Sequence, residues 1–413
     1  MKYQNFYKLF FIYLFFLISL IIGFFLNEDL GGGSKYDYGI HKETIRLLFL
    51  DSNLFGLLNY GDDEISTNTH SPVFMILLKY LTLNNEIFGR IIYLILSSSI
   101  VIFFYKSIKI KYKLDYCYLF VLSNFFLLSP YYRSYSIWPG DETLSILFFC
   151  ISIFFYLKIK FAKEEKNIKS YIFFNVFFLA ISSYLRPIYC IFSIFYFYSF
   201  FFDKKLDVKT LFFYFFVNLI LAFPAVYYVF VLDIKFFLAR VKEFNFIDSF
   251  ALFYLTIFFY LTPFIYLNFK NLIKSKIDLF ELSLLILSIL AVIFFFDYKI
   301  LSGGGFFYQL SLLFFDNSIL VYILFPVSFY FVNRLLYIKK FNNLVLIILL
   351  IFLELDDQFF IESYDPLFFL LFFLVFKSKY LEGFFKNLKE GVMVLFVFQL
   401  TLLTIKFIQQ NLL

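Results

Sequence analysis

The amino-acid sequence predicts an all-α, polytopic transmembrane protein, and three observations support this prediction. The chain is 62% hydrophobic and only 16% charged, whereas soluble domains are roughly half apolar and about a quarter charged. Apolar runs long enough to cross about 30 Å of hydrocarbon recur from one end of the sequence to the other. These runs are continuous, unlike the short alternating segments of membrane β-barrels. We therefore expect a single transmembrane helical domain over residues 1–413.

Thirteen apolar runs are candidate membrane spans. The first, Phe6–Leu26, is longer than the apolar region of a signal peptide and lacks a small-x-small cleavage site, so we expect it to be retained. Two late runs, Leu344–Leu355 and Pro366–Phe376, are short for a full crossing, which gives an expected total of about 11 to 13 spans. The remaining runs are Ile87–Tyr105, Tyr116–Pro130, Thr143–Leu157, Ser170–Leu185, Pro187–Phe202, Leu211–Leu232, Phe250–Phe269, Leu279–Phe296, Ser318–Val332 and Val392–Ile408.

The hinges between these runs alternate in charge. The basic hinges are 106–113, 158–169, 203–205, 270–276, 334–340 and 377–389, and the hinges between them are acidic or mixed. Short cytoplasmic loops concentrate Lys and Arg, so we expect a cytoplasmic N-terminus. The long first loop, residues 27–86, is then extracytoplasmic, and we expect amphipathic helices within it, such as one over Val73–Leu83.

Charge and cysteine usage exclude two classes of function. The net charge of +6 arises in the hinges, so it does not indicate nucleic-acid binding. The three cysteines, Cys117, Cys150 and Cys190, lie inside apolar runs without CxxC spacing. They are typical of buried apolar side chains, and they predict neither a disulfide framework nor a cysteine metal site.

The first loop carries the strongest chemical pattern in the chain. Its residues 27–72 hold eight acids and both histidines, His41 and His70. Asp37 and His41 are four residues apart, a spacing that places both on one face if the segment is helical. Asp37 and His41 are therefore our candidate catalytic residues, and the alternative for any one acid here is an ordinary solvated carboxylate.

Basic residues on the same expected side are candidates for binding an anionic substrate. Arg133 lies in the outer hinge 131–142 and Arg186 lies between two apolar runs, where a guanidinium group can bind a lipid phosphate bidentately. The alternative is that these side chains extend to the membrane interface only. Asp141, beside Glu142, is a substrate-binding candidate as well, although acids at this position also favour a helix N-terminus.

A further basic segment breaks the alternation of hinge charge. The segment Asp233–Phe244 places Lys235 and Arg240 on the outer side, interleaved with apolar residues. This pattern predicts an amphipathic helix lying on the lipid headgroups, either holding an anionic lipid or serving as a simple anchor.

The layout resembles the GT-C superfamily of membrane glycosyltransferases, especially the dolichol-linked glucosyltransferases and protein mannosyltransferases. The resemblance rests on Asp37 and His41 after the first span, on the Pro-containing turn that follows His70, and on Leu185-Arg186-Pro187. The family often has two adjacent acids before the histidine, whereas Tyr38 follows Asp37 here, and within the first loop adjacent acids occur only at 28–29 and 62–64.

The resemblance implies a polyprenyl-phosphate sugar as donor and a lipid-linked glycan, a lipid or a protein as acceptor, at the outer face of a bacterial cytoplasmic membrane. Asp37 would then be the general base, Arg186 and Arg133 would hold the phosphate, and His41 or His70 would orient the sugar or acceptor. Positive charge for the leaving phosphate comes from Arg or from a divalent metal (Mg²⁺ or Mn²⁺), and the sequence leaves this choice open.

Two other functions remain open at this stage. A polymerase or ligase of lipid-linked glycans would also act at the outer face, but its large loop usually comes late in the chain. A flippase or transporter tends to show two similar halves and ionisable groups near mid-bilayer. Here the span interiors hold almost no charge, which favours an enzyme at the outer face.

Overall fold

The computed structural model of the chain describes residues 2–31, 33–49, 71–82, 85–112, 116–162, 167–227, 230, 244–274, 277–300, 303–353 and 358–412. Over these ranges the protein is all-α and no strand occurs. The chain packs as two compact units, Met1–Ala239 with Phe396–Leu413, and Arg240–Leu395. The expectation of a single domain is not tested by this division and stays a prediction.

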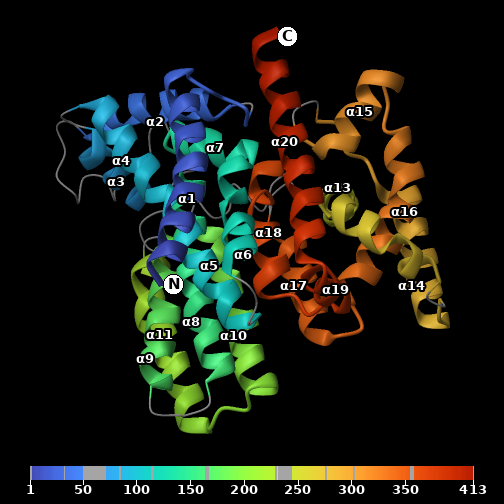
Figure 1. Cartoon of the computed structure of the whole chain (residues 1–413). Helices are drawn as coiled ribbons and strands as arrows, with labels where there is room; N and C mark the ends of the chain where they lie inside the picture. The colour runs from blue at the N-terminus through green and yellow to red at the C-terminus, as the bar shows by residue number, and fades with distance from the viewer. Residues whose placement is uncertain are drawn as a thin grey trace. The chain divides into compact units, whose positions relative to one another are not determined.

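The first unit is built from the helices that run from blue to green in Figure 1, together with most of α20. Their bounds are α1 Lys2–Phe25, α2 Ser34–Phe49, α3 Pro72–Thr82, α4 Glu86–Ser98, α5 Ile100–Lys111, α6 Tyr116–Ser123, η1 Asn124–Leu128, α7 Pro130–Ile137, α8 Asp141–Phe161, α9 Ile168–Leu185, η2 Pro187–Ile191, α10 Phe192–Tyr198, η3 Ser199–Asp203, α11 Val208–Tyr227 and α20 Leu388–Leu412.

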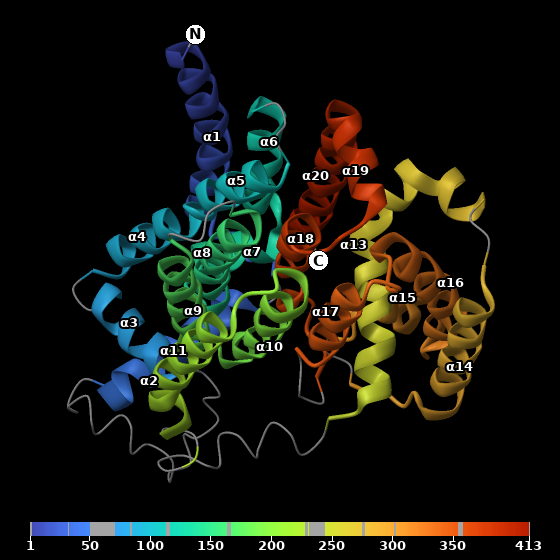
Figure 2. The same ribbon diagram turned by 90° about the horizontal axis from the view of Figure 1, so that it is seen from below.

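The second unit is organised around a long helix, α13, which packs against α15 and α16, as both Figure 1 and Figure 2 show. Its helices are α13 Phe246–Lys274, α14 Leu279–Phe295, α15 Gly305–Phe315, α16 Ile319–Leu336, α17 Phe341–Ile351, η5 Ile361–Ser363, α18 Leu367–Leu374 and α19 Lys379–Lys386, followed by the first turns of α20.

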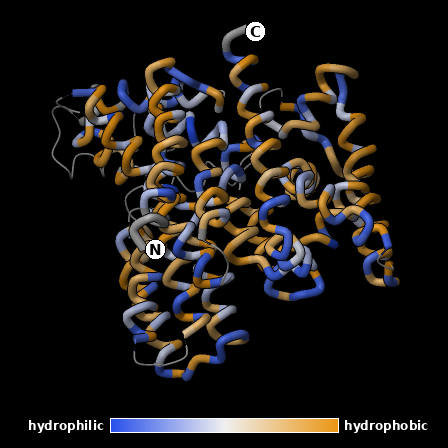
Figure 3. Tube along the Cα trace, in the orientation of Figure 1, coloured by the Kyte–Doolittle hydropathy of each residue, from blue (hydrophilic) through white to orange (hydrophobic). Residues whose placement is uncertain are grey.

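Eight helices within the described residues are long and apolar enough to cross a membrane, so the chain is an integral, multi-pass membrane protein. Six shorter apolar helices accompany them, and the total of about 11 to 13 crossings stays a prediction. Figure 3 shows apolar residues along most of the helices and polar ones at their ends and connections. The eight are Tyr7–Phe25, Glu86–Lys111, Asp141–Phe161, Ile168–Leu185, Val208–Tyr227, Phe246–Lys274, Ile319–Leu336 and Leu388–Gln410.

Over its described residues, every apolar run singled out in the sequence coincides mainly with one helix or with two or three consecutive helices. The prediction of helices within the first loop is confirmed by α2 and α3. Three other helices, α7, α15 and α19, occupy stretches that we expected to be hinges. Their sequences are too short or too polar to read as spans, although side-chain caps mark two of their starts: Ser129 accepts from the Tyr132 amide and Ser378 from the Tyr380 amide.

Polar bonds between α8 and α9 hold one end of this pair in register. The amide of Asn175 donates to the Ser152 carbonyl at 2.9 Å, and the Ser152 hydroxyl donates to the Asn175 carbonyl at 2.8 Å. Nearer the start of α8, the Ser182 hydroxyl donates to the Ser145 carbonyl at 2.8 Å. The start of α8 and the end of α9 are thereby fixed beside each other, and the candidate site lies there.

Candidate functional site

The segment that follows α1 is held against α7 by a buried ion pair. The chain turns at Asn27, whose φ is 53°, and the Glu28 amide donates to the Gly23 carbonyl at 2.9 Å. This turn directs the Glu28 carboxylate to Arg133 on α7. Both Glu28 oxygens accept from Arg133, from Nε and from Nη2, each at 2.6 Å. The pair is 3% and 4% exposed, so water barely screens it.

The remaining Arg133 donors are also engaged. Nη1 donates to the Ser19 hydroxyl at 3.1 Å and to the Leu127 carbonyl at 3.0 Å, and Nη2 donates to the Ser19 carbonyl at 3.1 Å. Arginine has five N–H donors, and all five are therefore in bonds within the protein. A phosphate could bind Arg133 only by displacing one of these partners. The predicted phosphate-binding role of Arg133 is not tested, but its geometry supports a structural role.

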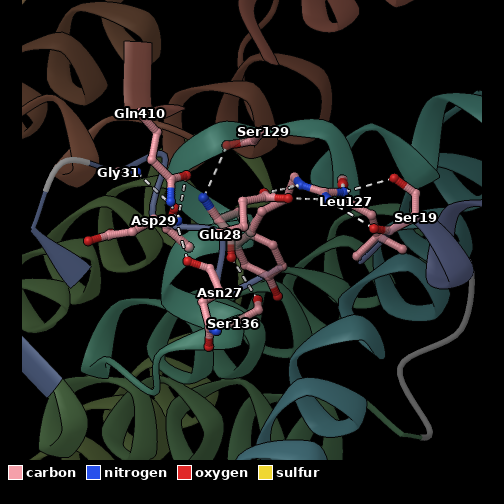
Figure 4. A network of polar contacts seen from close by, with 12 residues as sticks. Ser19, Asn27, Glu28, Asp29, Gly31, Leu127, Ser129, Ser136 and Gln410 are labelled. Atoms are coloured by element: carbon pink, nitrogen blue, oxygen red, sulfur yellow. Dashed lines mark hydrogen bonds and ion pairs between the residues drawn. The ribbon is translucent and has the colours of Figure 1, made fainter. Parts of the chain in front are cut away.

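Further bonds fix the same segment to α7 and to α20. The Trp138 indole donates to the Glu28 carbonyl at 3.0 Å. The Asp29 amide donates to the Gln410 side chain at 3.0 Å, and the Gly31 amide donates to the Ser134 hydroxyl at 2.8 Å. Figure 4 shows Gln410 extending toward Asn27 and Asp29, with Ser19 and Leu127 on the other side of Glu28. This network sets where α2 begins.

A stacked arginine supports the inner side of α2. The Arg90 guanidinium lies 3.7 Å from the ring centre of Trp138 and 5.8 Å from that of Tyr38. Arg90 Nε donates to the Ile137 carbonyl at 3.0 Å. Burial, together with the nearby carboxylate of Glu86, raises the pKa of the Tyr38 phenol, so this phenol stays protonated at neutral pH. Tyr38 therefore contributes packing contacts of α2 with Arg90 and Trp138 and does not act as a base.

Asp37, in the first turn of α2, is the half-buried acid that this scaffold presents. The Tyr135 hydroxyl of α7 donates to Asp37 Oδ2 at 3.0 Å. The prediction that Asp37 and His41 share a helix is confirmed, because α2 extends from Ser34 to Phe49. His41 is only 1% exposed and its ring packs edge-on against Phe74 of α3, with 5.3 Å between ring centres.

The start of α8 brings two further acids toward Tyr135. Asp141 and Glu142 are buried in the first turn of α8, directly after Gly140. A Cβ atom at Gly140 would stand 2.3 Å from the Tyr135 ring and 2.7 Å from Glu142 Oε2. The Tyr135 ring and the Glu142 carboxylate therefore both occupy the space that a side chain at Gly140 would need, and only glycine fits at this position.

Arg186 completes the arrangement from the end of α9. Its Nη1 lies 3.5 Å from Glu142 Oε1, and its side chain is 19% exposed, several times the value for Arg133. Asp37 thus contacts Tyr135, Arg186 contacts Glu142, and Tyr135 and Glu142 both lie beside Gly140. We call Asp37, Tyr135, Glu142 and Arg186, with Asp141, the acid–arginine cluster. Three of the predicted site residues meet in it: Asp37, Asp141 and Arg186.

The segment that enters α3 reaches the same end of α9. The Ser71 hydroxyl donates to the carbonyl of Tyr184, two residues before Arg186. His70, which precedes Ser71, lies outside the described residues, as do Lys235 and Arg240. Their predicted binding roles therefore stay predictions.

The described side chains do not form an evident metal site. Among these residues no group of three or more His, Cys, Asp or Glu side chains is placed to hold one ion. Hard divalent cations require several oxygen ligands, so the described carboxylates do not fit Mg²⁺ or Mn²⁺ by themselves. The positive charge that the cluster itself offers is Arg186.

Three participants were not among the predicted site residues: Glu28, Tyr135 and Glu142. In the sequence, Glu28 cannot be distinguished from other loop acids, nor Tyr135 from other interfacial tyrosines. Their partners, Arg133 and Asp37, are brought to them only by tertiary packing. Glu142 could have been chosen, because it stands beside Asp141 at the start of an apolar run.

Comparison of the chain with protein-family models gives no match, and comparison with curated proteins gives no significant relative. The interpretation of the acid–arginine cluster therefore rests on its own geometry.

Proposed function

We propose that this protein is a membrane glycosyltransferase of the GT-C type, which moves a sugar from a polyprenyl-phosphate carrier to an acceptor hydroxyl. The observation that carries the proposal is the acid–arginine cluster: a half-buried carboxylate is bonded to Tyr135, a partly exposed guanidinium is paired with Glu142, and Tyr135 and Glu142 both lie beside Gly140. Glycosyl transfer from a lipid phosphate requires both groups, a base for the acceptor and positive charge for the leaving phosphate.

Asp37 is the proposed general base. Its carboxylate takes the proton of the acceptor hydroxyl while the hydroxyl oxygen forms a bond to the anomeric carbon and the bond from that carbon to the phosphate oxygen breaks. Tyr135, which donates to Oδ2 at 3.0 Å, orients the carboxylate. His41, one helical turn away and buried against Phe74, fixes α2 against α3.

Arg186 is the proposed partner of the leaving phosphate. Its guanidinium compensates the charge that develops as the carrier phosphate departs. Glu142, at 3.5 Å, holds the guanidinium in place without burying it. The acceptor is a lipid-linked glycan, a lipid or a protein, and each reaches the site from the membrane surface.

The distribution of charge along α8 supports an extracytoplasmic site. Asp141 and Glu142 lie in its first turn and Lys158 and Lys160 in its last. A helix of 21 residues spans about 30 Å, so the acids and the lysines stand at opposite faces of the membrane. Because Lys and Arg concentrate in cytoplasmic loops, we place the cluster at the outer face of a bacterial cytoplasmic membrane, with the N-terminus inside.

Sugar transfer by the purified protein in lipid vesicles tests the proposal. A panel of radiolabelled polyprenyl-phosphate sugars is offered to the wild type, to Asp37→Asn and to Glu43→Gln, an exposed acid on the same helix. We expect Asp37→Asn to lose transfer by about 10²- to 10⁴-fold, the usual contribution of a general base, and Glu43→Gln to retain it.

Three outcomes decide between the candidates. Full activity in a folded Asp37→Asn variant would move the base to another acid and leave the class intact. Growth of a repeating glycan would identify the polymerase alternative. Absence of transfer with every donor, combined with movement of a fluorescent lipid-linked sugar between leaflets, would overturn the proposal in favour of a flippase.

A further inference from the structure

A cavity in the second unit lies where three helices meet: the start of α14, the end of α16 and the start of α19. Its volume is about 160 Å³. The basic hinges 334–340 and 377–389 both contribute to its lining. Its polar lining consists of Glu281, Tyr330, Asn333, Arg334, Tyr337, Lys339, Lys379 and Tyr380.

Positive charge exceeds negative charge in this cavity. Arg334, Lys339 and Lys379 line it against the single carboxylate of Glu281. Arg334 Nη2 lies 3.2 Å from Glu281 Oε2, and Lys339 Nζ lies 3.2 Å from Glu281 Oε1 and also contacts Asp278. Even when Asp278 is counted, three cations face two acids, so one positive charge remains in excess.

Asn333 presents a side-chain donor at the cavity wall. Asn333 is 9% exposed and its side-chain oxygen accepts from the Tyr254 hydroxyl at 2.8 Å. Within the described part of the chain, its side-chain nitrogen makes no hydrogen bond, although Asn333 lines the cavity. This nitrogen is accessible from the cavity, so a ligand bound there can accept a hydrogen bond from it.

The walls of the cavity are fixed in advance. The Asn343 amide donates to the Leu336 carbonyl at 2.5 Å and to the Lys377 carbonyl at 2.8 Å, which ties the end of α16 to the entry of α19. The Ser378 hydroxyl donates to the Leu335 carbonyl at 2.5 Å. Preformed walls lower the entropy lost when a ligand binds.

The rest of the lining is apolar and continues onto a helix that faces outward. Ile277, Leu284, Leu285, Phe329 and Ile338 line the cavity beside the charged groups. Other faces of α14 expose apolar side chains, including Leu282, Ile286 and Leu290. A ligand that fits this surface has a compact anionic head and an apolar tail.

We propose that this cavity binds the phosphate of an anionic membrane phospholipid, with Arg334, Lys339, Lys379 and the Asn333 amide as donors and the acyl chains along α14. Clusters of Lys and Arg between membrane helices favour anionic headgroups, with a contribution of about 1 kcal/mol for each basic residue. The site belongs to the second unit and does not depend on the proposed glycosyl transfer.

Lipid titration of the delipidated full-length protein in mild detergent tests this proposal. Three probes are compared by native mass spectrometry and by the shift in unfolding temperature: dioctanoyl phosphatidylglycerol, dioctanoyl phosphatidylcholine and inorganic phosphate. We expect the phosphatidylglycerol to bind as one retained molecule and to raise the unfolding temperature, and the other two to do neither at equal concentration.

Two variants locate the binding without disturbing the buried Arg334. Lys379→Gln should weaken phosphatidylglycerol binding about fivefold, whereas Lys386→Gln, an exposed lysine on the same helix outside the cavity, should not change it. Asn333→Asp keeps the oxygen that accepts from Tyr254 but replaces the donor with a negative charge, and it should weaken binding further.

Several results would overturn the inference. Equal binding of phosphatidylcholine would remove the preference for anionic headgroups. Equal loss in Lys379→Gln and Lys386→Gln, or in neither, would show that the lipid lies elsewhere. Binding of inorganic phosphate with the same affinity would identify a site for a free anion and reject the lipid assignment.

Discussion

Arg133 and Arg186 belong to the same unit and were both predicted to bind phosphate, yet their surroundings differ. Arg133 is 3% exposed and all five of its donors meet protein acceptors. Arg186 is 19% exposed and its contact with Glu142 is 3.5 Å, against 2.6 Å for Arg133 with Glu28. The first geometry is typical of a structural ion pair, whereas the second leaves part of the guanidinium exposed.

The largest expected effect is a loss of stability when the buried Glu28–Arg133 pair, here called the closed pair, is broken. Arg133→Gln leaves the Glu28 carboxylate buried without its partner, and we expect a loss of about 3–5 kcal/mol in the free energy of unfolding. Arg186→Gln breaks a longer contact whose side chains are 19% and 12% exposed, so we expect a smaller loss. Denaturant unfolding of both variants in detergent measures the difference, and equal losses would remove the distinction between the two arginines.

The complementary effect concerns sugar transfer and rests on the proposed function. Arg186→Gln should lower kcat by about 10²- to 10³-fold, the usual cost of removing a group that stabilises transition-state charge. Arg186→Lys should recover part of this loss because it restores the charge but not the bidentate geometry. If Arg186→Gln retains the kcat of the wild type in the vesicle assay, Arg186 does not contact the phosphate.

A smaller loss of stability is expected at Gly23, against which the closed pair packs. A Cβ atom here would stand 2.3 Å from Glu28 Oε2 and 2.8 Å from Arg133 Nη2. We expect Gly23→Ala to lower the free energy of unfolding by about 1–3 kcal/mol through overpacking. Gly39→Ala is the control, because nothing lies within 4 Å of its Cβ position, and it should gain about 0.5–1 kcal/mol as an alanine within α2.

The smallest effect separates two tyrosines of α7. The Tyr135 hydroxyl donates to Asp37, and the Tyr132 hydroxyl donates to the Ser97 carbonyl at 2.8 Å. We expect Tyr135→Phe to reduce transfer about tenfold with little change in stability, and Tyr132→Phe to lower the free energy of unfolding by about 1 kcal/mol with little change in transfer. If Tyr132→Phe lowered transfer and Tyr135→Phe lowered only stability, Asp37 would not be the base.

The sequence predicted the helices well because each apolar run is long and continuous. It failed for α7, whose eight residues, PYYRSYSI, contain no apolar stripe. This helix forms because Ser129 caps it, Pro130 starts it and its polar side chains find partners on α1 and α2. Such partners are set by tertiary packing, which local composition does not encode.

The candidate site was predictable in part for the same reason. Asp37, Asp141 and Arg186 were selected because charged groups next to membrane spans require a function or a partner. The sequence could not separate Arg133 from Arg186, since the partner of Arg133 is an acid 105 residues away. Only the turn at Asn27 shows that Glu28 faces inward while Asp29 bonds to Ser34 at 2.5 Å.

The hydrogen bonds between Gln410 and the turn after α1 have a consequence for the synthesis of the protein. The Gln410 side chain accepts a hydrogen bond from the Asp29 amide and donates one to the Asn27 carbonyl at 3.3 Å. More than 380 residues separate Gln410 from these partners in the sequence. These bonds cannot form until α20 has left the ribosome and entered the membrane. During synthesis, the segment that positions Asp37 is therefore fixed only after α20 has been inserted. A nascent chain that stalls before α20 would reach the bilayer with its acid–arginine cluster incompletely assembled.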